Sequence, residues 1–482
     1  MPPSLSTPRP SPEGPGDVLR EDGTAIQLSH AFRQEGHELY VVGGWVRDAL
    51  LGRPHVDLDF STDAPPERTL GILRRFTDTV WAQGMRYGTV GGKIEGIAFE
   101  ITTFRSERYR PGSRHPDVDF VGDVVTDLSR RDFTVNAMAV RLPEREAIDP
   151  FGGREHLRER RLMTPIAPEA SFLDDPLRML RAFRLASQLK FRIDPAVEDT
   201  IADLKDRLTT VSAERIRDEL LRLMVGSAPA EALERAEATG LTGLFLPELS
   251  ALRLEQDPVH RHKDVFRHTL AVVERTDPKP ELRLAALLHD IGKPRTRRID
   301  PEGVSFHHHE VVGAEMAKAR LTALRFPNDT VNVVSEIIRL HHRFHTYRLG
   351  WTDAAVRRYV RDAGPLLPLL NALVRADCTT RNPVKAKRLA ARMDELESRI
   401  TELAAKEELA KMRPELDGHE VMEILSAPPG PVVGEALAYL LDLRLDEGEL
   451  GKEEVRRRLL DWAHARGISP RPDNLERGPT PG

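Results

Sequence analysis

Apolar and polar residues follow two different periods along the chain. Between about residues 38 and 145 they alternate in short runs punctuated by glycine, a pattern typical of half-buried β-strands. From about residue 150 onward, apolar residues recur every three or four positions, which is typical of amphipathic helices. The pattern therefore predicts an α+β protein, with a mixed sheet and its helices at the N-terminus and an all-α body behind it.

The segment 39–60 predicts a strand, a glycine turn, a short helix and a second strand. Gly43 and Gly44 end the first strand, and apolar residues at 56, 58 and 60 alternate with Asp57 and Asp59. Because successive side chains of a strand point to opposite faces, both carboxylates project from one face, about 7 Å apart. The sequence therefore predicts a pair of acidic groups on one strand, directly behind a tight turn.

Such a pair is suited to hard cations, which prefer oxygen ligands. Two metal ions about 4 Å apart are a common device for phosphoryl transfer. Gly43 and Gly44 allow backbone amides to approach a triphosphate closely. Arg47, which follows them beside Asp48, is predicted to bind the nucleotide as well. The alternative is an edge strand with a solvated acidic face, and the neighbouring glycine and Arg-Asp pairs weigh against it.

A second polar cluster lies in the segment 129–140, where apolar residues are interleaved with Arg130, Arg131, Asp132 and Asn136. Guanidinium groups bind phosphate oxygens two at a time, so the paired arginines suit a triphosphate. Asp132 and Asn136 have the groups needed to hydrogen-bond a ribose hydroxyl. The alternative is a surface ion-pair cluster.

A third cluster combines Asp175 with Arg178, Arg181 and Arg184, which share one face of a predicted helix. A carboxylate accepts hydrogen bonds and a guanidinium only donates them. Cytosine and adenine, which offer an amino group beside an unprotonated ring nitrogen, match such a pair. Uracil and guanine place a carbonyl where the carboxylate needs a donor, which costs about 1–3 kcal/mol. The alternative is that Asp175 is only the N-cap of a helix that starts at Pro176.

Histidine and aspartate recur at helical positions in the middle of the chain. His289 and Asp290 are embedded in an apolar helix, where burying the pair is costly unless something ligates it. Further candidates flank this pair on both sides, namely His268, His309, His341, His342 and Asp377. A single histidine is usually structural, whereas this set in this order indicates a metal site.

Composition limits the class of protein. With 482 residues the chain is expected to form two to four domains. Its net charge of −5 excludes a strongly basic coat for nucleic acid but allows a local basic groove. A single cysteine excludes disulfides within the chain and favours a reducing compartment. No apolar run approaches 18 residues and no signal core is present, which predicts a cytoplasmic protein without membrane contact.

The first two clusters together resemble the head of a class II tRNA nucleotidyltransferase, in the superfamily of CCA-adding enzymes and bacterial poly(A) polymerases. The resemblance covers most of the chain. It implies a nucleotidyltransferase palm in which Asp57 and Asp59 hold catalytic Mg²⁺ and Asp132 lies near the ribose. Glu100, at the end of a nearby strand, is a further carboxylate candidate. The implied substrates are CTP and ATP, and the implied partner is the 3′ acceptor end of tRNA.

The third cluster resembles the Glu-Asp-x-x-Arg motif with which this family selects bases, and Asp174 stands here in place of the usual glutamate. The polar segment 104–129 predicts a loop, and in the family this region holds an element needed for the final A. Because the segment looks full-length, we expect CCA addition. The alternatives are A-only or CC-only addition, and poly(A) polymerase activity on generic RNA.

The histidine set resembles the HD phosphohydrolase superfamily. By that resemblance, His268, His289, Asp290 and Asp377 hold one metal, and His309 with His341 or His342 holds a second. Mixed nitrogen and oxygen ligands suit Mn, Fe, Ni or Mg. The metal would activate water for phosphoester hydrolysis, with Lys293 neutralising the phosphate. A rival interpretation makes this hydrolysis the main activity and the head a simple RNA-binding module.

The expected domain order follows from these assignments. It is a disordered extension (1–24), the nucleotidyltransferase head (25–165), a helical base-recognition neck (166–250), the HD domain (251–385), a helical tRNA-binding region (386–468) and a disordered tail (469–482). Basic runs at 381–392 and 456–466 are candidates for phosphate contacts with tRNA. For each of these runs, the alternative is a solvated helix face.

Overall fold

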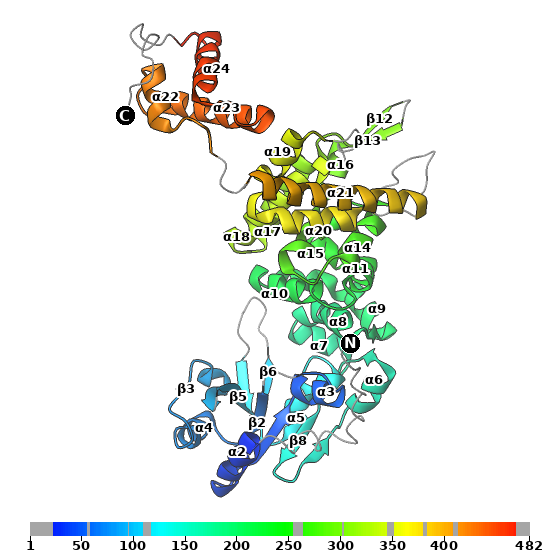
Figure 1. Cartoon of the computed structure of the whole chain (residues 1–482). Helices are drawn as coiled ribbons and strands as arrows, with labels where there is room; N and C mark the ends of the chain where they lie inside the picture. The colour runs from blue at the N-terminus through cyan, green and yellow to red at the C-terminus, as the bar shows by residue number, and fades with distance from the viewer. Residues whose placement is uncertain are drawn as a thin grey trace, which may run out of the picture. The chain divides into compact units, whose positions relative to one another are not determined.

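A computed structural model of the chain is shown in Figure 1. It describes residues 23–54, 58–94, 96–108, 117–253, 264–300, 303–344, 351–378, 383–407 and 413–468. Asp57 and the two predicted disordered termini, apart from residues 23 and 24, lie outside these ranges. The chain divides into two compact units, Met1–Val334 and Ser335–Gly482. The division falls within one helix, α18 (Asn328–His341).

The first unit begins with the predicted mixed sheet. Its seven strands are ordered β3-β4-β5-β2-β1-β8-β9, with β2 and β5 parallel and the other neighbours antiparallel. The strands are β1 (Leu39–Val42), β2 (Leu58–Thr62), β3 (Val80–Trp81), β4 (Thr89–Ile94), β5 (Ile97–Thr103), β8 (Ala139–Leu142) and β9 (Glu146–Ile148). All four residues of β1 are buried, as expected for a central strand.

Helices flank this sheet and complete the head (Figure 1). They are α2 (Gly23–Gln34), α3 (Gly44–Leu50), α4 (Pro66–Leu73), α5 (Val124–Ser129) and α6 (Gly153–Glu159). The predicted order of strand, glycine turn, helix and strand is confirmed, with β1, α3 and β2 at the expected positions. Trp45, Val46 and Ala49 are the buried residues of α3, so the helix packs its apolar side inward.

The segment 104–129 has more regular structure than the predicted loop. Strand β6 (Arg105–Arg108) pairs in antiparallel fashion with β7 (Asp117–Phe120), and α5 follows. The hairpin tip, 109–116, lies outside the described residues. The loop prediction was therefore wrong for the two arms of the hairpin, because β6 has no apolar residue and the alternation in β7 extends over only four residues.

The rest of the first unit is helical, as predicted. Its helices are α7 (Pro168–Asp174), α8 (Leu177–Leu189), α9 (Pro195–Leu204), α10 (Ala213–Met224), α11 (Pro229–Ala238), α12 (Thr242–Phe245), α13 (Pro247–Ser250), α14 (Val265–Arg275), α15 (Pro280–Leu288), α16 (Lys293–Thr296) and α17 (His309–Ala323). Two short strand pairs add to them: β10 (Arg161–Leu162) with β11 (Arg192–Ile193), and β12 (Arg298–Asp300) with β13 (Gly303–Ser305). Helix α8 packs against α10 and α11 and thereby joins the base-recognition segment to the helical body.

The second unit is also helical. It contains α19 (Asp353–Ala363), α20 (Leu367–Asp377), α21 (Pro383–Glu407), α22 (Gly418–Leu425), α23 (Pro431–Glu447) and α24 (Lys452–Ala465). The last three helices share a hydrophobic core that includes Val421, Leu440, Leu459 and Trp462. Arg361 of α19 pairs with Asp442 of α23 at 2.7 Å, which ties this core to the helices before it.

Candidate active site

Asp59 lies on the solvent-facing side of β2, between the buried residues Leu58 and Phe60. This alternation confirms the predicted direction of the carboxylate. In the parallel pairing of β2 with β5, Asp59 is aligned with Glu100, which is also exposed. Aligned residues of neighbouring strands place their side chains on one face about 5 Å apart. The sheet therefore brings a second carboxylate beside Asp59, as predicted for Glu100.

The glycine turn lies against the arginine pair. Gly43 has a φ of 74°, a conformation that favours glycine. A Cβ atom on Gly43 would lie 2.7 Å from Nη1 of Arg131. Glycine at this position therefore permits both the turn and the close approach of the guanidinium group to the backbone.

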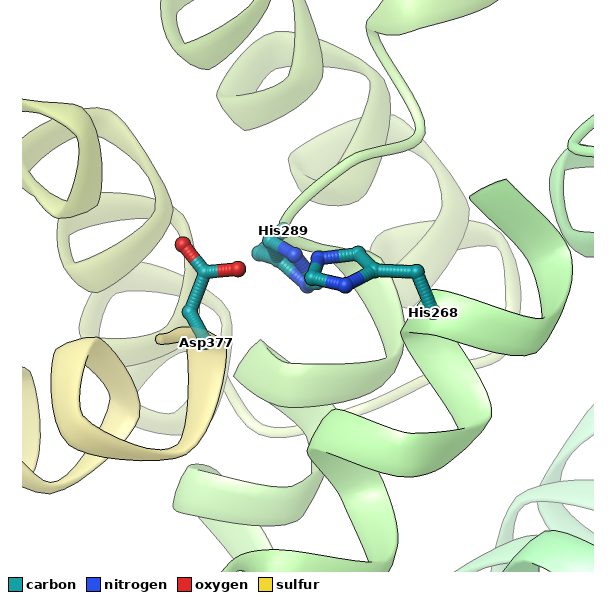
Figure 2. A group of neighbouring side chains, drawn as sticks. All are labelled: His268, His289 and Asp377. Atoms are coloured by element: carbon teal, nitrogen blue, oxygen red, sulfur yellow. The ribbon is translucent and has the colours of Figure 1, made fainter. Parts of the chain in front are cut away.

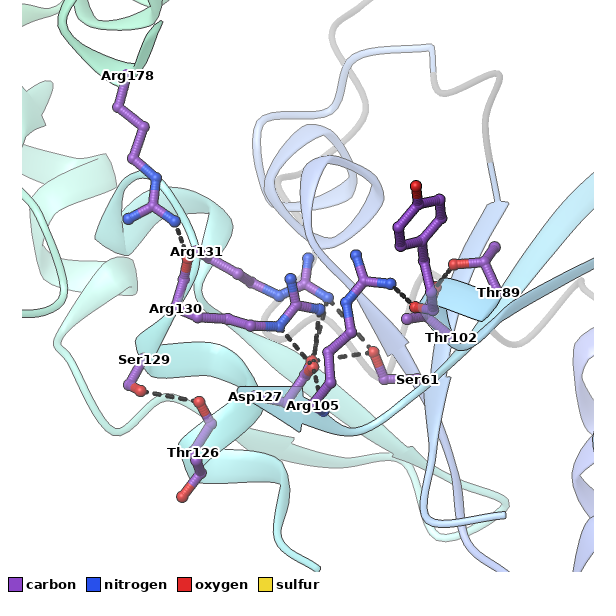
Figure 3. Close-up of polar contacts among 11 residues, drawn as sticks. Ser61, Thr89, Thr102, Arg105, Thr126, Asp127, Ser129, Arg130, Arg131 and Arg178 are labelled. Atoms are coloured by element: carbon purple, nitrogen blue, oxygen red, sulfur yellow. Dashed lines mark hydrogen bonds and ion pairs between the residues drawn. The ribbon is translucent and has the colours of Figure 1, made fainter. Parts of the chain in front are cut away.

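Asp127 anchors both arginines and was not predicted as a site residue. Its fully buried carboxylate accepts hydrogen bonds from Arg130 Nε and Nη2 at 3.0 and 2.8 Å, and Arg131 Nη2 lies at 3.5 Å (Figure 3). Ser61 Oγ donates to the same carboxylate at 3.1 Å. Burial alone would raise the pKa of Asp127, but the two guanidinium charges outweigh it and lower the pKa.

The position of Asp127 fixes where the arginines lie. Ser61 follows Asp59 by two residues and so shares its face of the sheet. Arg131 Nη2 also contacts Ser61 Oγ at 3.3 Å. The arginine pair therefore lies on the face that carries Asp59, where a triphosphate bound to a metal at Asp59 would need positive charge.

Asp132 and Asn136 form a buried hydrogen-bonded network. Asp132 Oδ1 accepts hydrogen bonds from the Phe133 backbone at 2.8 Å and from Asn136 Nδ2 at 2.9 Å. Asp132 Oδ2 lies 3.2 Å from Arg181 Nη2. Burial alone would raise the pKa of Asp132, but the charge of Arg181 and the Asn136 hydrogen bond lower it to about 2. Asp132 is therefore an ionised acceptor near neutral pH.

Asp175 and Arg178 are both buried, and each is held by several groups. Asp175 Oδ1 accepts a hydrogen bond from the Leu177 backbone amide at 3.1 Å at the start of α8, although Pro176 and not Asp175 occupies the N-cap position of that helix. Asp175 Oδ2 accepts one from Arg215 Nη2 of α10 at 2.7 Å. Arg178 Nη1 donates to Ser171 Oγ at 2.9 Å, and its Nη2 donates to the Arg130 carbonyl (Figure 3). Arg178 thus connects α8 to the arginine pair of the head.

The remaining arginines of α8 face a buried glutamate of α10. Arg184 Nε lies 2.9 Å from Glu219 Oε2, and Arg181 Nε lies 3.8 Å from Glu219 Oε1. Arg215 and Glu219, four residues apart on α10, were not predicted as site residues. Their spacing in the sequence indicates only that they share a helix face, and their partners on α8 are set by tertiary packing.

The predicted histidine cluster is assembled around Asp290 in the first unit. Asp290 Oδ2 lies 3.3 Å from His289 Nε2 and 3.6 Å from His268 Nε2, and its Oδ1 lies 3.6 Å from His309 Nε2. Lys293 Nζ contacts Oδ2 at 2.6 Å. Burial alone would raise the pKa of Asp290, but the charges of His289 and Lys293 outweigh it and hold the pKa well below its ordinary value. The carboxylate is thus ionised among three imidazole nitrogens.

The histidines present the nitrogen that a metal requires. His289 Nδ1 lies 2.8 Å from the Ala286 carbonyl, and His309 Nδ1 lies 2.9 Å from the Phe306 carbonyl. A carbonyl only accepts hydrogen bonds, so Nδ1 carries the proton and the lone pair is on Nε2. Burial also lowers the pKa of His309, which favours its neutral, metal-binding form.

The second unit carries the other predicted ligands. His341 is buried at the end of α18, with Nδ1 2.5 Å from the Ile338 carbonyl, so its proton is placed in the same way. Asp377 is the last residue of α20. Figure 2 draws Asp377 with His268 and His289.

Three family models match successive parts of the chain. The poly A polymerase head domain matches residues 39–163. The model described as a probable RNA and SrmB-binding site of polymerase A matches residues 190–252. The HD domain matches residues 265–406, which include all six predicted ligands of the histidine cluster.

Two relatives match the chain almost from end to end. An A-adding tRNA nucleotidyltransferase from Deinococcus radiodurans is 36% identical over 439 residues, covering 88% of this chain and 95% of the relative. A CC-adding tRNA nucleotidyltransferase from Thermus thermophilus is 36% identical over 450 residues, covering 89% of this chain and 94% of the relative. The chain belongs to the tRNA nucleotidyltransferase family.

The fold comparison agrees with this assignment. The crystal structure of the Bacillus stearothermophilus CCA-adding enzyme in complex with CTP has a TM-score of 0.68 and 27% identity, covering 93% of this chain and 98% of that chain. The predicted family and fold class are therefore confirmed, and the chain is a nucleotidyltransferase. Within the described ranges, this nucleotidyltransferase has no helix long and apolar enough to cross a membrane.

Gly292 controls the packing of the histidine cluster in this nucleotidyltransferase. A Cβ atom there would lie 2.1 Å from the His309 carbonyl oxygen and 2.7 Å from the Gly313 nitrogen, both of which are backbone atoms. We expect Gly292→Ala to push α17 away and to lower stability by about 1–3 kcal/mol. Bound metal, measured by elemental analysis, should fall, and nucleotide incorporation should persist. Gly71→Ala is the control, because its Cβ meets nothing within 4 Å.

Proposed function

We propose that this nucleotidyltransferase adds C and A from CTP and ATP to the 3′ end of tRNA without a nucleic-acid template, releasing pyrophosphate. The supporting observation is the placement of the base-selecting pair. Asp175 and Arg178 are buried, and Arg178 donates to the backbone carbonyl of Arg130 in the predicted triphosphate-binding segment. A base held by Asp175 and Arg178 would therefore lie next to the groups that hold the phosphates.

The metal chemistry rests on the acidic strand. Exposed Asp59 and the aligned Glu100 provide oxygen ligands of the kind that Mg²⁺ prefers, and Asp57, outside the described residues, would add another. Bound Mg²⁺ would neutralise the triphosphate and orient the attacking hydroxyl. Arg130, Arg131 and the glycine turn would hold the phosphates by charge-assisted and backbone hydrogen bonds.

Binding of the tRNA acceptor end is proposed for the second unit. Lys387 and Arg388 are exposed on α21, within the predicted basic run 381–392. In the other run, Arg457 and Arg458 of α24 both pair with Glu454. Local pairing weakens the attraction of α24 for phosphates, so we favour α21 as the main electrostatic contact.

The nucleotide range is best tested on tRNA substrates that end in no C, in one C and in CC. We expect the enzyme to complete CCA on all three, as the full-length segment 104–129 predicts. The measurement is the length and sequence of the extended 3′ end with CTP and ATP together. Incorporation of a single A on the CC-ending substrate alone would contradict full CCA addition.

A-only and CC-only addition are further candidates, because the A-adding relative covers 88% of this chain and the CC-adding relative covers 89%, each at 36% identity. CC-only addition would stop the tRNA series at CC. Poly(A) synthesis is the last candidate, and it would appear as long A tails on an unstructured oligonucleotide offered beside tRNA. The tRNA series and the oligonucleotide together distinguish these outcomes without any mutation.

We propose a divalent-metal phosphohydrolase site in the HD domain. The predicted ligands are His268, His289, Asp290 and His309 in the first unit and His341 and Asp377 in the second. Asp290 directs Oδ2 toward His268 and His289 and Oδ1 toward His309, which supports a carboxylate shared between two ions. Mn, Ni, Fe and Mg suit this donor set. If no phosphoester is cleaved with added Ni²⁺ or Mn²⁺, the hydrolase proposal fails.

A further inference from the structure

Each of the three nitrogens of the Arg47 guanidinium group donates a hydrogen bond to a protein side chain. Its Nε and Nη2 donate to Asp48 at 2.9 and 2.7 Å, a bidentate ion pair. Its Nη1 donates to Asn136 Oδ1 at 2.6 Å. The carboxylate of Asp48 neutralises the charge that a phosphate would require.

The bond to Asn136 determines how that side chain is oriented. An amide oxygen accepts and an amide nitrogen donates. Because Arg47 binds Oδ1, Asn136 must turn Nδ2 toward Asp132, and the observed distance from Nδ2 to Asp132 Oδ1 is 2.9 Å. Arg47 therefore fixes the amide at one end and Asp132 fixes it at the other.

Asp132 Oδ2 can accept a hydrogen bond from a ligand in addition to its ion pair with Arg181 Nη2 at 3.2 Å. The oxygen is buried and makes no hydrogen bond among the described residues, and a carboxylate oxygen has two lone pairs. Next to it, Asn136 Nδ2 has a second N–H beyond the one bound to Asp132. An acceptor and a donor side by side match the two hydroxyls of a ribose, each of which donates and accepts.

We propose that Arg47 is a positioning residue for sugar selection, acting through Asn136 and Asp132 so that ribonucleotides are used in preference to 2′-deoxyribonucleotides. The proposal rests on the proposed function and on the predicted position of the ribose near Asp132. It differs from the sequence prediction, in which Arg47 binds the nucleotide directly.

The test compares kcat/KM for ATP with dATP and for CTP with dCTP in the full-length enzyme. Arg47→Met should lower the preference for the ribonucleotide by about tenfold, the worth of one charge-assisted hydrogen bond. Asn136→Ala should lower it by at least as much. The double variant should match Asn136→Ala alone, because Arg47 acts only through Asn136. Arg47→Lys, which keeps a cationic donor, should show an intermediate preference.

Arg53→Met is the control for the loss of one positive charge near α3. Arg53 follows that helix, and its Nη1 donates to the Gln188 carbonyl at 3.3 Å. It should leave the sugar preference unchanged. An equal rise in KM for ATP and dATP in Arg47→Met would overturn the proposal, because it would make Arg47 a phosphate ligand. Multiplicative effects in the double variant would overturn it as well. A wild-type enzyme that uses dATP as well as ATP would instead remove the ribose assignment itself.

Discussion

Replacing Asp59 with alanine should abolish nucleotide incorporation, with a loss of about a thousandfold or more. Asp59 is exposed on β2 and supports no core packing, so the loss should come without unfolding. Its carboxylate is the described member of the acidic pair that would hold catalytic Mg²⁺. Removing it leaves the triphosphate without a metal bridge at the point where charge develops in the transition state.

The measurement is incorporation of labelled ATP and CTP into tRNA, accompanied by a melting curve. Asp57→Ala should give the same loss. Asp78→Ala is a matched control, because it removes an exposed carboxylate from the same head domain. Asp59→Ala with incorporation close to that of the wild type would refute the metal-site assignment.

The spacing of apolar residues and glycines along the sequence predicted those parts of the site that are formed by residues close together in the chain. The order of β1, turn, α3 and β2 follows from apolar alternation ended by two glycines, and alternation also gives the direction of Asp59. Asp127 could also have been predicted from residues close to it in the chain, although the sequence analysis did not name it. It lies on α5 and precedes Arg130 and Arg131, which directly follow that helix, by three and four residues, a spacing that indicates ion pairs on one helix face.

Other contacts were beyond such patterns because they depend on tertiary packing. Arg215 is 40 residues from Asp175, and Ser61 is 66 residues from Asp127. Nothing in the periodicity of α10 indicates that Arg215 and Glu219 face α8. The sequence also predicted Arg47 as a nucleotide ligand. Its ion pair with the adjacent Asp48 is local, whereas its hydrogen bond to Asn136, 89 residues away, forms only when distant segments meet in the fold.

Asp175→Ala should relax base selection. The variant loses the acceptor that rejects a carbonyl, so discrimination against UTP and GTP should fall by about 1–3 kcal/mol, or roughly tenfold to a hundredfold. The structure strengthens this expectation, since Arg215 and the Leu177 amide hold the carboxylate in one orientation. Arg178→Ala should weaken the use of CTP and ATP together. The measurement is incorporation of each of the four nucleotides.

The alternative is that Asp175 matters only as a helix cap, and the chain offers a matched control for it. Asp194 also precedes a proline, and its Oδ1 accepts a hydrogen bond from the backbone amide two residues later at 3.0 Å, as Asp175 does. Asp194→Ala should lower stability by about 1 kcal/mol and leave base selection unchanged. If Asp175→Ala shows the same stability loss and an unchanged preference for C and A, the carboxylate is a cap and the bases are chosen elsewhere. If selection relaxes only in Asp175→Ala, the cap bond cannot explain it, because both variants lose that bond.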